Sequence, residues 1–134
     1  MRYMLDTNIC IDLLRRRSSN ALKHIEKCNI GDICISSITL AELQHGVVKS
    51  SNFPKSAEIL SCFLTDIEIL SFDSNAAVWY GQHRAYLESK GTPIGPMDML
   101  IAAHASSLDI TLVTNNMREF KRIKGLKLEN WIRN

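Results

Sequence analysis

RYMLDTNICIDLL, residues 2–14, decides the fold class of this 134-residue chain. A short apolar run over 2–5 ends at Asp6, which predicts a buried first strand, and apolar side chains then recur at helical spacing up to Leu14. Further strands are expected at 33–35, 67–70, 111–114 and 127–129. Strands that alternate with helices are typical of a parallel sheet covered on both faces. We therefore predict a three-layer α/β fold with a central parallel sheet of four to five strands.

The connections between these strands carry helix signals. Helices are expected over 7–14, 20–27, 36–48, 54–64, 73–90, 96–105 and 115–120. Pro54 stands where a first helical turn tolerates proline, and Gly91 follows one helix as a normal C-terminal signal. Because no internal repeat, low-complexity stretch or linker interrupts the pattern, we expect a single domain over 1–134.

Composition and charge exclude several classes of protein. The formal charge of +2 is too small to indicate nucleic-acid binding by itself, so such binding needs a local patch. The four cysteines, Cys10, Cys28, Cys34 and Cys62, include no C-x-x-C pair, and we expect reduced, mostly buried thiols. The sequence shows neither a signal peptide nor an apolar run of about 20 residues, which predicts a cytoplasmic protein without a membrane partner.

Three isolated carboxylates, Asp6, Glu42 and Asp98, each stand where an apolar run gives way to a turn or a helix start. Acids that are far apart in sequence can meet at one edge of an α/β sheet, where strand ends and helix starts converge. Gathered acids repel one another, and an all-oxygen ligand set favours Mg²⁺ or Mn²⁺ over zinc. The alternative is that each acid only caps its own helix.

The capping alternative differs in strength among the three acids. Aspartate is a favoured N-cap, so Asp6 can satisfy backbone N–H groups of the next helix, although Thr7 can cap it equally well. Thr39 and Glu42 fit a capping box, which favours a capping or solvated role for Glu42. Asp98 stands in the first turn of a helix that is apolar almost all round, where a carboxylate is costly unless it is paired or binds a metal. Asp98 is therefore the strongest candidate ligand.

A fourth candidate region, residues 114–120, follows the strand at 111–114. Asn116 can cap the short helix there, with Glu119 three residues later completing a capping box. Either side chain can instead reach a site at the strand ends, and both roles stay open for this pair. A divalent ion at that edge would activate water and neutralise a phosphodiester during in-line attack.

Four ordered blocks of sequence resemble the VapC toxins, which are PIN-domain ribonucleases of bacterial toxin–antitoxin systems. The blocks are MLDTN at 4–8, SSITLAEL at 36–43 with Gly46 after it, IGPMD at 94–98 and VTNNMREF at 113–120. The resemblance runs from Tyr3 to at least Trp131, nearly the whole chain. It implies a PIN-like fold and a Mg²⁺- or Mn²⁺-dependent endoribonuclease.

The resemblance also implies roles for single residues. Asp6 and Asp98 would be the principal metal ligands, and Glu42 would complete the shell or position the attacking water. Many PIN domains carry an aspartate where this chain has Asn116, a neutral ligand at best, and Glu119 is the nearest acid that can compensate as a catalytic residue. The polar side chains that would orient the carboxylates are those of Thr7, Asn8, Thr114 and Asn116.

Partners follow from the same resemblance. VapC proteins are usually neutralised by a cognate VapB-type antitoxin whose C-terminal segment covers the acid pocket, often with an arginine that replaces the metal as counter-charge. A homodimer is typical, as is a hetero-oligomer with the antitoxin that binds operator DNA only through the antitoxin. Substrates in the family are structured RNAs, and similar members cut initiator tRNA near the anticodon. We therefore expect tRNA cleavage that inhibits translation.

Basic residues near the C-terminus are the candidate RNA contacts. The side chains that would meet backbone phosphates are those of Arg118, Lys121, Arg122 and Lys124. For each of them the alternative is an ordinary solvated basic face.

Two other classes stay open from the residues alone. A phosphoacceptor receiver domain has similar length, alternating order and an acid pocket with Mg²⁺, but it expects a lysine just after its last strand. This chain has Thr114-Asn115-Asn116 there and offers no lysine. A non-catalytic binding module is the third class, and it requires that the acids do not converge.

Overall fold

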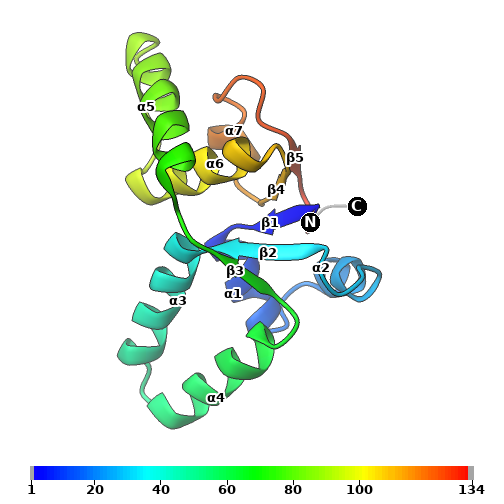
Figure 1. Ribbon diagram of the computed structural model, residues 1–134. Coiled ribbons are helices and arrows are strands. Elements are labelled where there is room, and N and C mark those ends of the chain that lie inside the picture. Colours follow the sequence, from blue (N-terminus) through cyan, green and yellow to red (C-terminus); the bar gives the residue numbers. More distant parts are fainter. Residues whose placement is uncertain (1, 133–134) are drawn as a thin grey trace.

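A five-stranded sheet forms the centre of the computed structural model, which describes residues 2–132 (Figure 1). The strands are β1 (Tyr3–Leu5), β2 (Ile33–Ser36), β3 (Glu68–Leu70), β4 (Thr111–Val113) and β5 (Leu128–Glu129). Their order is β3-β2-β1-β4-β5, and all neighbours are parallel. The predicted parallel sheet is confirmed. Because receiver domains have the strand order 2-1-3-4-5, this order argues against the receiver alternative.

Helices occupy the connections, as predicted. They are α1 (Thr7–Leu14), α2 (Ser19–Glu26), α3 (Ser37–Lys49), α4 (Phe53–Leu64), α5 (Ser74–Ser89), α6 (Pro96–Leu108) and α7 (Met117–Phe120). Some bounds differ from the prediction. α6 continues beyond Ala105 to Leu108, where Asp109 adopts a left-handed conformation with φ 53° and ends the helix. α4 begins one residue before Pro54, because the side chain of Asn52 caps it.

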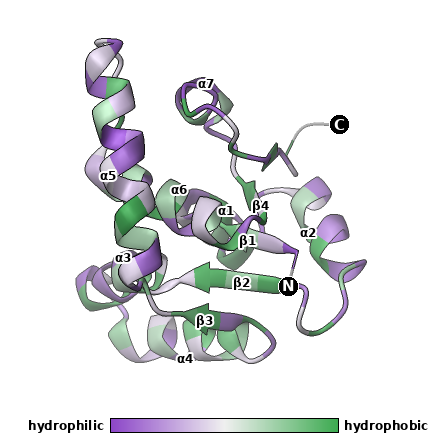
Figure 2. Cartoon of the chain, turned by 45° about the horizontal axis from the view of Figure 1, so that its top comes forward, coloured by the Kyte–Doolittle hydropathy of each residue, from purple (hydrophilic) through white to green (hydrophobic). Residues whose placement is uncertain are grey.

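The two faces of the sheet bury different side chains, because successive residues of a strand point to opposite sides. Leu5 and Val113 pack in a core with α1, α2, α3 and α4, whereas Met4 and Leu112 pack in a second core with α5, α6 and α7. Figure 1 shows these two groups of helices on opposite sides of the sheet, and Figure 2 shows that β2 is hydrophobic along most of its length. The three-layer prediction is therefore confirmed.

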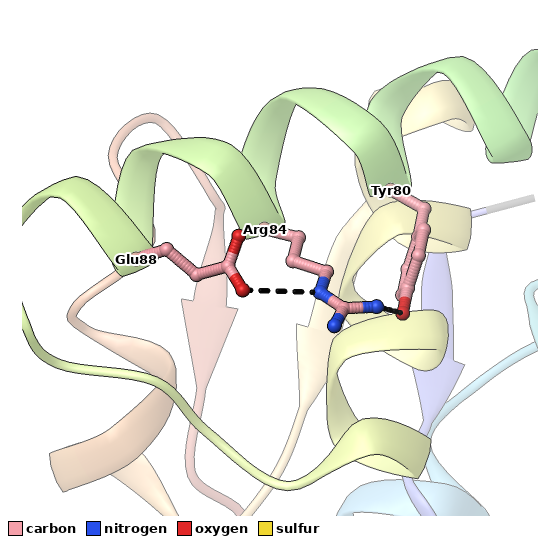
Figure 3. A network of polar contacts seen from close by, with 3 residues as sticks. All are labelled: Tyr80, Arg84 and Glu88. Carbon is pink, nitrogen blue, oxygen red and sulfur yellow. Dashed lines mark hydrogen bonds and ion pairs between the residues drawn. The ribbon is translucent and has the colours of Figure 1, made fainter.

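α5 projects away from the sheet and keeps much of its surface exposed (Figure 1). On this surface Arg84 donates hydrogen bonds to the hydroxyl of Tyr80, at 3.0 Å, and to Oε2 of Glu88, at 3.4 Å (Figure 3). The partners stand four residues before and after Arg84, so all three share one side of the helix. Ion pairs this exposed add little to stability.

Ser36 connects the two helical layers at the end of β2. Its Oγ accepts a hydrogen bond from the Ile38 amide as the N-cap of α3, and it lies 2.8 Å from Nδ1 of buried His104 on α6. Burial lowers the pKa of His104, although the charge of Asp73 acts in the opposite direction. The imidazole is therefore neutral near pH 7, and its contact with Ser36 joins two uncharged groups inside the protein.

Ser36→Ala is expected to lower the free energy of unfolding by about 2–4 kcal/mol, because it removes a helix cap and leaves His104 without its buried partner. Ser18→Ala is the matched control, since Ser18 caps α2 in the same way and loses about 1 kcal/mol from the cap alone. Urea unfolding of both variants measures the difference. Equal losses would show that the contact with His104 contributes nothing.

The cysteines are all free thiols, and their burial is mixed. Cys10 and Cys34 are buried as predicted, Cys28 is partly buried, and Cys62 is exposed. The prediction of mostly buried thiols is wrong for Cys62, which α4 turns towards solvent. Within residues 2–132 the protein has no helix with the length and apolar character that a membrane span requires.

Candidate active site

The carboxyl ends of β1, β2 and β4 lie at one edge of the sheet, because these strands are parallel neighbours. Asp6 follows β1, and β2 leads into α3, which carries Glu42. Asp98 belongs to the first turn of α6, and Glu119 belongs to α7, which follows β4. We call these four residues the acid cluster, because their charges influence one another as described below.

Asp6 is almost fully buried, with 2% of its surface exposed, and it caps α1 by accepting a 2.9 Å hydrogen bond from the Ile9 amide. Thr7 begins this helix, so the prediction that Thr7 can serve as the cap is wrong. Burial raises the pKa of Asp6 to about 6, and the charge of Asp98 adds to the rise, while hydrogen bonds from Thr114 and Ile9 oppose it. A buried carboxylate with this pKa is one that a bound cation would stabilise.

The pKa of Asp98 is raised by burial and raised further by the charges of two other members of the acid cluster, Glu119 and Glu42. The ion pairs found between residues 2 and 132 use other acids, namely Asp12, Glu88 and Asp109. Within that part of the chain, no lysine or arginine forms an ion pair with the acid cluster. The sheet edge therefore carries uncompensated negative charge.

Glu42 accepts a 2.5 Å hydrogen bond from the Thr7 hydroxyl, which joins α3 to α1. The capping-box prediction for Glu42 is wrong, because α3 begins at Ser37 with Ser36 as its cap, and Thr39 lies inside the helix. The buried hydroxyl of Thr39 has no hydrogen-bond partner in the described part of the chain. Thr7 therefore orients Glu42 from a different helix, 35 residues away in sequence.

Asn116 occupies the N-cap position of α7, but its side chain makes no capping hydrogen bond. Its Nδ2 donates instead to Oε2 of Glu119 at 3.2 Å, and its backbone N–H donates to the Thr114 hydroxyl at 2.9 Å. The predicted capping box is therefore wrong, because Thr114 takes the backbone amide that Glu119 would have bonded. Asn116 orients Glu119, whose charge acts on Asp98.

The donor set of the acid cluster fits Mg²⁺ or Mn²⁺, although it does not form a closed cage. Within residues 2–132, no three acidic, histidine or cysteine side chains are close enough together to hold an ion between them. Mg²⁺ keeps several of its waters and is usually held by one or two carboxylates, so it needs no such cage. Uncompensated charge on oxygen ligands at Asp6 and Asp98 meets that requirement.

Thr7→Val is expected to weaken Mn²⁺ binding by about 10- to 100-fold, because a side chain that orients a carboxylate contributes about this much to metal affinity. Valine has nearly the same shape but cannot donate to Glu42. Isothermal titration with Mn²⁺ measures the effect, and Thr7→Ser, which keeps the hydroxyl, is the control expected to bind like the wild type. Unchanged affinity in the valine variant would contradict the role of this hydrogen bond.

The basic residues predicted to contact RNA divide into two groups. Arg118, Lys121 and Lys124 are exposed. Arg122 is partly buried and donates a 3.1 Å hydrogen bond to the Pro93 carbonyl, which ties the end of α7 to the connection before α6. Arg122 therefore has a structural contact that the sequence did not indicate.

A pocket beside the acid cluster includes residues that the sequence analysis did not select. It has a volume of about 440 Å³, and we call it the amide pocket. Its lining residues are Asn8, Ile11, Asp12, Arg17, Asn115 and Asn116. Asn8 is exposed and its side chain makes no hydrogen bond to a carboxylate within residues 2–132, so in this structure it does not orient the acid cluster by such a bond. No pattern in the sequence indicated that Asp12 and Arg17 meet the loop after β4.

Comparison with known proteins places this chain beside one family. The model of the PIN domain family matches residues 3–126. The tRNA(fMet)-specific endonuclease VapC of Salmonella typhimurium is 42% identical over 131 residues, and ribonuclease VapC2 of Rickettsia felis is 46% identical over 132 residues, each match covering 98% of both chains. A chain in the crystal structure of DNA-bound VapBC from Salmonella typhimurium has a TM-score of 0.93 at 42% identity and covers 98% of both chains.

Proposed function

Because this chain belongs to the PIN-domain family of VapC toxin ribonucleases from VapBC toxin–antitoxin systems, we propose that it cleaves the initiator tRNA, tRNA(fMet), with Mg²⁺ or Mn²⁺ at its acid cluster. The site assignment rests on Asp98, whose pKa is raised by burial and by the charges of Glu119 and Glu42. We also propose a single domain over 1–134, because the family model matches 3–126 and one sheet joins β1, at the start of that range, to β4 near its end and to β5 just beyond it.

Each member of the acid cluster has a separate task in this proposal. Asp6 and Asp98 hold the ion, since burial and mutual repulsion give them the strongest need for a cation. Glu42 completes the shell around the ion and also accepts the proton of the attacking water, because Thr7 fixes only one of its oxygens in the contact that the structure records. Glu119 stands in for the aspartate that Asn116 replaces, and Asn116 holds its carboxylate in place.

The reaction is hydrolysis of a phosphodiester bond. The water oxygen attacks phosphorus in line as its proton passes to Glu42, and the bond from phosphorus to the leaving ribose oxygen breaks as that oxygen takes a proton from solvent. When bound, the ion supplies positive charge that acidifies water and neutralises the phosphodiester. The exposed side chains of Arg118, Lys121 and Lys124 hold backbone phosphates of the substrate, with Arg122 beside them.

Purified, antitoxin-free protein incubated with total tRNA and Mg²⁺ or Mn²⁺ tests this function. We expect discrete cuts in the anticodon region of tRNA(fMet), no cuts when EDTA is present, and an intact elongator methionine tRNA in the same reaction. Cleavage that survives EDTA would overturn the metal-dependent mechanism. Equal cleavage of the elongator tRNA would overturn the proposed substrate while leaving the ribonuclease in place.

A cognate VapB-type antitoxin is the proposed protein partner. A groove of about 620 Å³ runs between α1, α3 and α4, with Leu14, Leu43 and Leu60 among its apolar lining residues and Glu42 also in its wall. Apolar side chains of an antitoxin segment can fill it, and an arginine that reaches Glu42 can pair with the carboxylates. Hydrogen exchange should show α3 and α4 protected in the complex. Protection confined to α5 would contradict this docking site.

The remaining partners concern assembly. We propose that the protein forms a homodimer. We also propose a hetero-oligomer with the antitoxin, in which only the antitoxin contacts operator DNA. The related structure from Salmonella typhimurium is a DNA-bound VapBC complex, and α5 exposes the apolar side chains of Val78, Trp79 and Tyr86 that a second copy can bury. Light scattering and gel shifts provide the test. A monomeric mass or a DNA shift by the toxin alone would contradict the corresponding part.

A further inference from the structure

The amide pocket lies between the first two turns of α1 and the connection from β4 to α7. Asn116 bonds Glu119 at 3.2 Å, so one of the lining residues contacts the acid cluster directly, and Asn8 belongs to the first turn of the helix that Asp6 caps. A strand of RNA whose phosphate lies at the acid cluster therefore has a neighbouring nucleotide within reach of this pocket.

Three side-chain amides belong to the polar lining of the pocket, and two of them, those of Asn115 and Asn116, each make one recorded side-chain hydrogen bond. The side chain of Asn8 makes no hydrogen bond in the described part of the chain. The carbonyl oxygen of Asn115 accepts a 3.1 Å hydrogen bond from Asn130, which leaves the Asn115 amino group as a donor. Amides carry a donor and an acceptor side by side, the arrangement that matches the edge of a nucleobase.

Arg17 gives the pocket a positive group that can take a phosphate. Its guanidinium is 3.8 Å from Asp12, a long and weak pairing, and 57% of its side chain is exposed. A guanidinium in this state can turn to a phosphate, which offers two oxygens in a geometry that suits it. Charge and amides thus stand together in a pocket beside the acid cluster.

We propose that the amide pocket binds the nucleotide next to the scissile phosphate and reads its base through Asn8 and Asn115, while Arg17 contacts its phosphate. This inference rests on the proposed ribonuclease function and adds a specificity site to it. Sequence-specific RNA recognition targets unstacked bases in single-stranded loops, and such a base can enter a pocket of about 440 Å³.

Side-chain amide signals in a ¹⁵N-labelled NMR spectrum test the proposal without any cleavage. The probes are the four nucleoside 5′-monophosphates and ribose 5-phosphate, each titrated in EDTA, and the Asn8→Ala and Asn115→Ala variants assign the signals. We expect the Asn8 and Asn115 signals to shift with one or two of the bases, at least fivefold tighter than with ribose 5-phosphate. Equal shifts with ribose 5-phosphate, or no shift at these residues, would overturn base reading.

Variants then connect the pocket with specificity. Substrates are RNA hairpins that differ only in the nucleotides flanking the cut, and kcat/KM is measured for each. Asn8→Ala and Asn115→Ala are expected to reduce the preference between flanking bases by about tenfold, the loss of one good amide–base pair. Arg17→Ala is expected to lower kcat/KM by the same factor for all of the hairpins. Asn75→Ala on α5 and Lys55→Ala on α4 are exposed controls expected to match the wild type.

The two tests separate this proposal from the proposed function. An unchanged base preference in Asn8→Ala and Asn115→Ala, with normal cleavage, would overturn the pocket and leave the ribonuclease standing. Wild-type protein without ribonuclease activity would remove the proposed function, whereas base-selective shifts at Asn8 and Asn115 in EDTA would still show a nucleotide site.

Discussion

Asp98→Asn is expected to abolish metal-dependent cleavage while leaving the protein at least as stable as the wild type. Removing this charge takes away the proposed metal ligand, worth about 4 kcal/mol of transition-state stabilisation, which corresponds to a loss of about 10³-fold in kcat. Stability behaves differently, because the carboxylate is half-buried, is affected by the charges of Glu119 and Glu42, and has no paired cation among residues 2–132. Asparagine removes that repulsion and occupies nearly the same volume. Cleavage rates and thermal unfolding in EDTA measure the two effects.

Asp66→Asn is the matched control for this experiment. Asp66 is an exposed acid outside the acid cluster, so the variant is expected to cleave and unfold like the wild type. Cleavage by Asp98→Asn at the wild-type rate would assign the nuclease activity to a contaminant. A large loss of stability in Asp98→Asn would instead show that this carboxylate has a structural task.

The metal-free protein is expected to lose stability as the pH rises from about 4 to above 6, because of Asp6. Its pKa is about 6 in the folded protein against an ordinary value of 3.8, so between these values the folded state binds more protons than the unfolded state. The contribution of Asp6 is therefore fully present below pH 3.8 and is lost as the pH rises through about 6. The shift corresponds to about 3 kcal/mol.

Asp6→Asn isolates this contribution. Asparagine is as good an N-cap as aspartate, so the bond from the Ile9 amide survives while the titrating group is gone. In EDTA, urea unfolding at pH 4.5 and pH 7.5 is expected to show a smaller pH dependence in the variant than in the wild type. Equal pH dependence in both proteins would contradict the raised pKa. Metal affinity of the wild type should also increase as the pH passes 6, since the ligand must lose its proton.

Local sequence was sufficient for the elements and for their layers. The apolar run before Asp6 is buried in β1, and the strands predicted from their β-type runs all lie in the sheet, because side-chain periodicity directly reflects which face of an element is buried. The cost of placing a carboxylate on an apolar helix likewise singled out Asp98, which the structure places among repelling charges.

Capping motifs were less reliable, because several side chains compete for the same backbone amides. Thr39 and Glu42 have the spacing of a capping box, yet Ser36 caps the helix and Glu42 bonds Thr7. Asparagine is a favoured N-cap residue, yet the backbone N–H of Asn116 donates its hydrogen bond to the Thr114 hydroxyl. In each case a nearby hydroxyl group makes the hydrogen bond that the motif assigned to another side chain. Spacing along the chain does not show which of the possible partners is closer in space.

The sequence by itself determined the α/β class, the parallel sheet and the family, since these follow from periodicity and from ordered motifs within single segments. Only the tertiary structure decided which distant side chains meet. The contacts of Thr7 with Glu42 and of Ser36 with His104 span 35 and 68 residues, and the amide pocket joins α1 to the loop after β4. Such contacts depend on how whole helices pack against the sheet, and local sequence patterns carry no record of that packing.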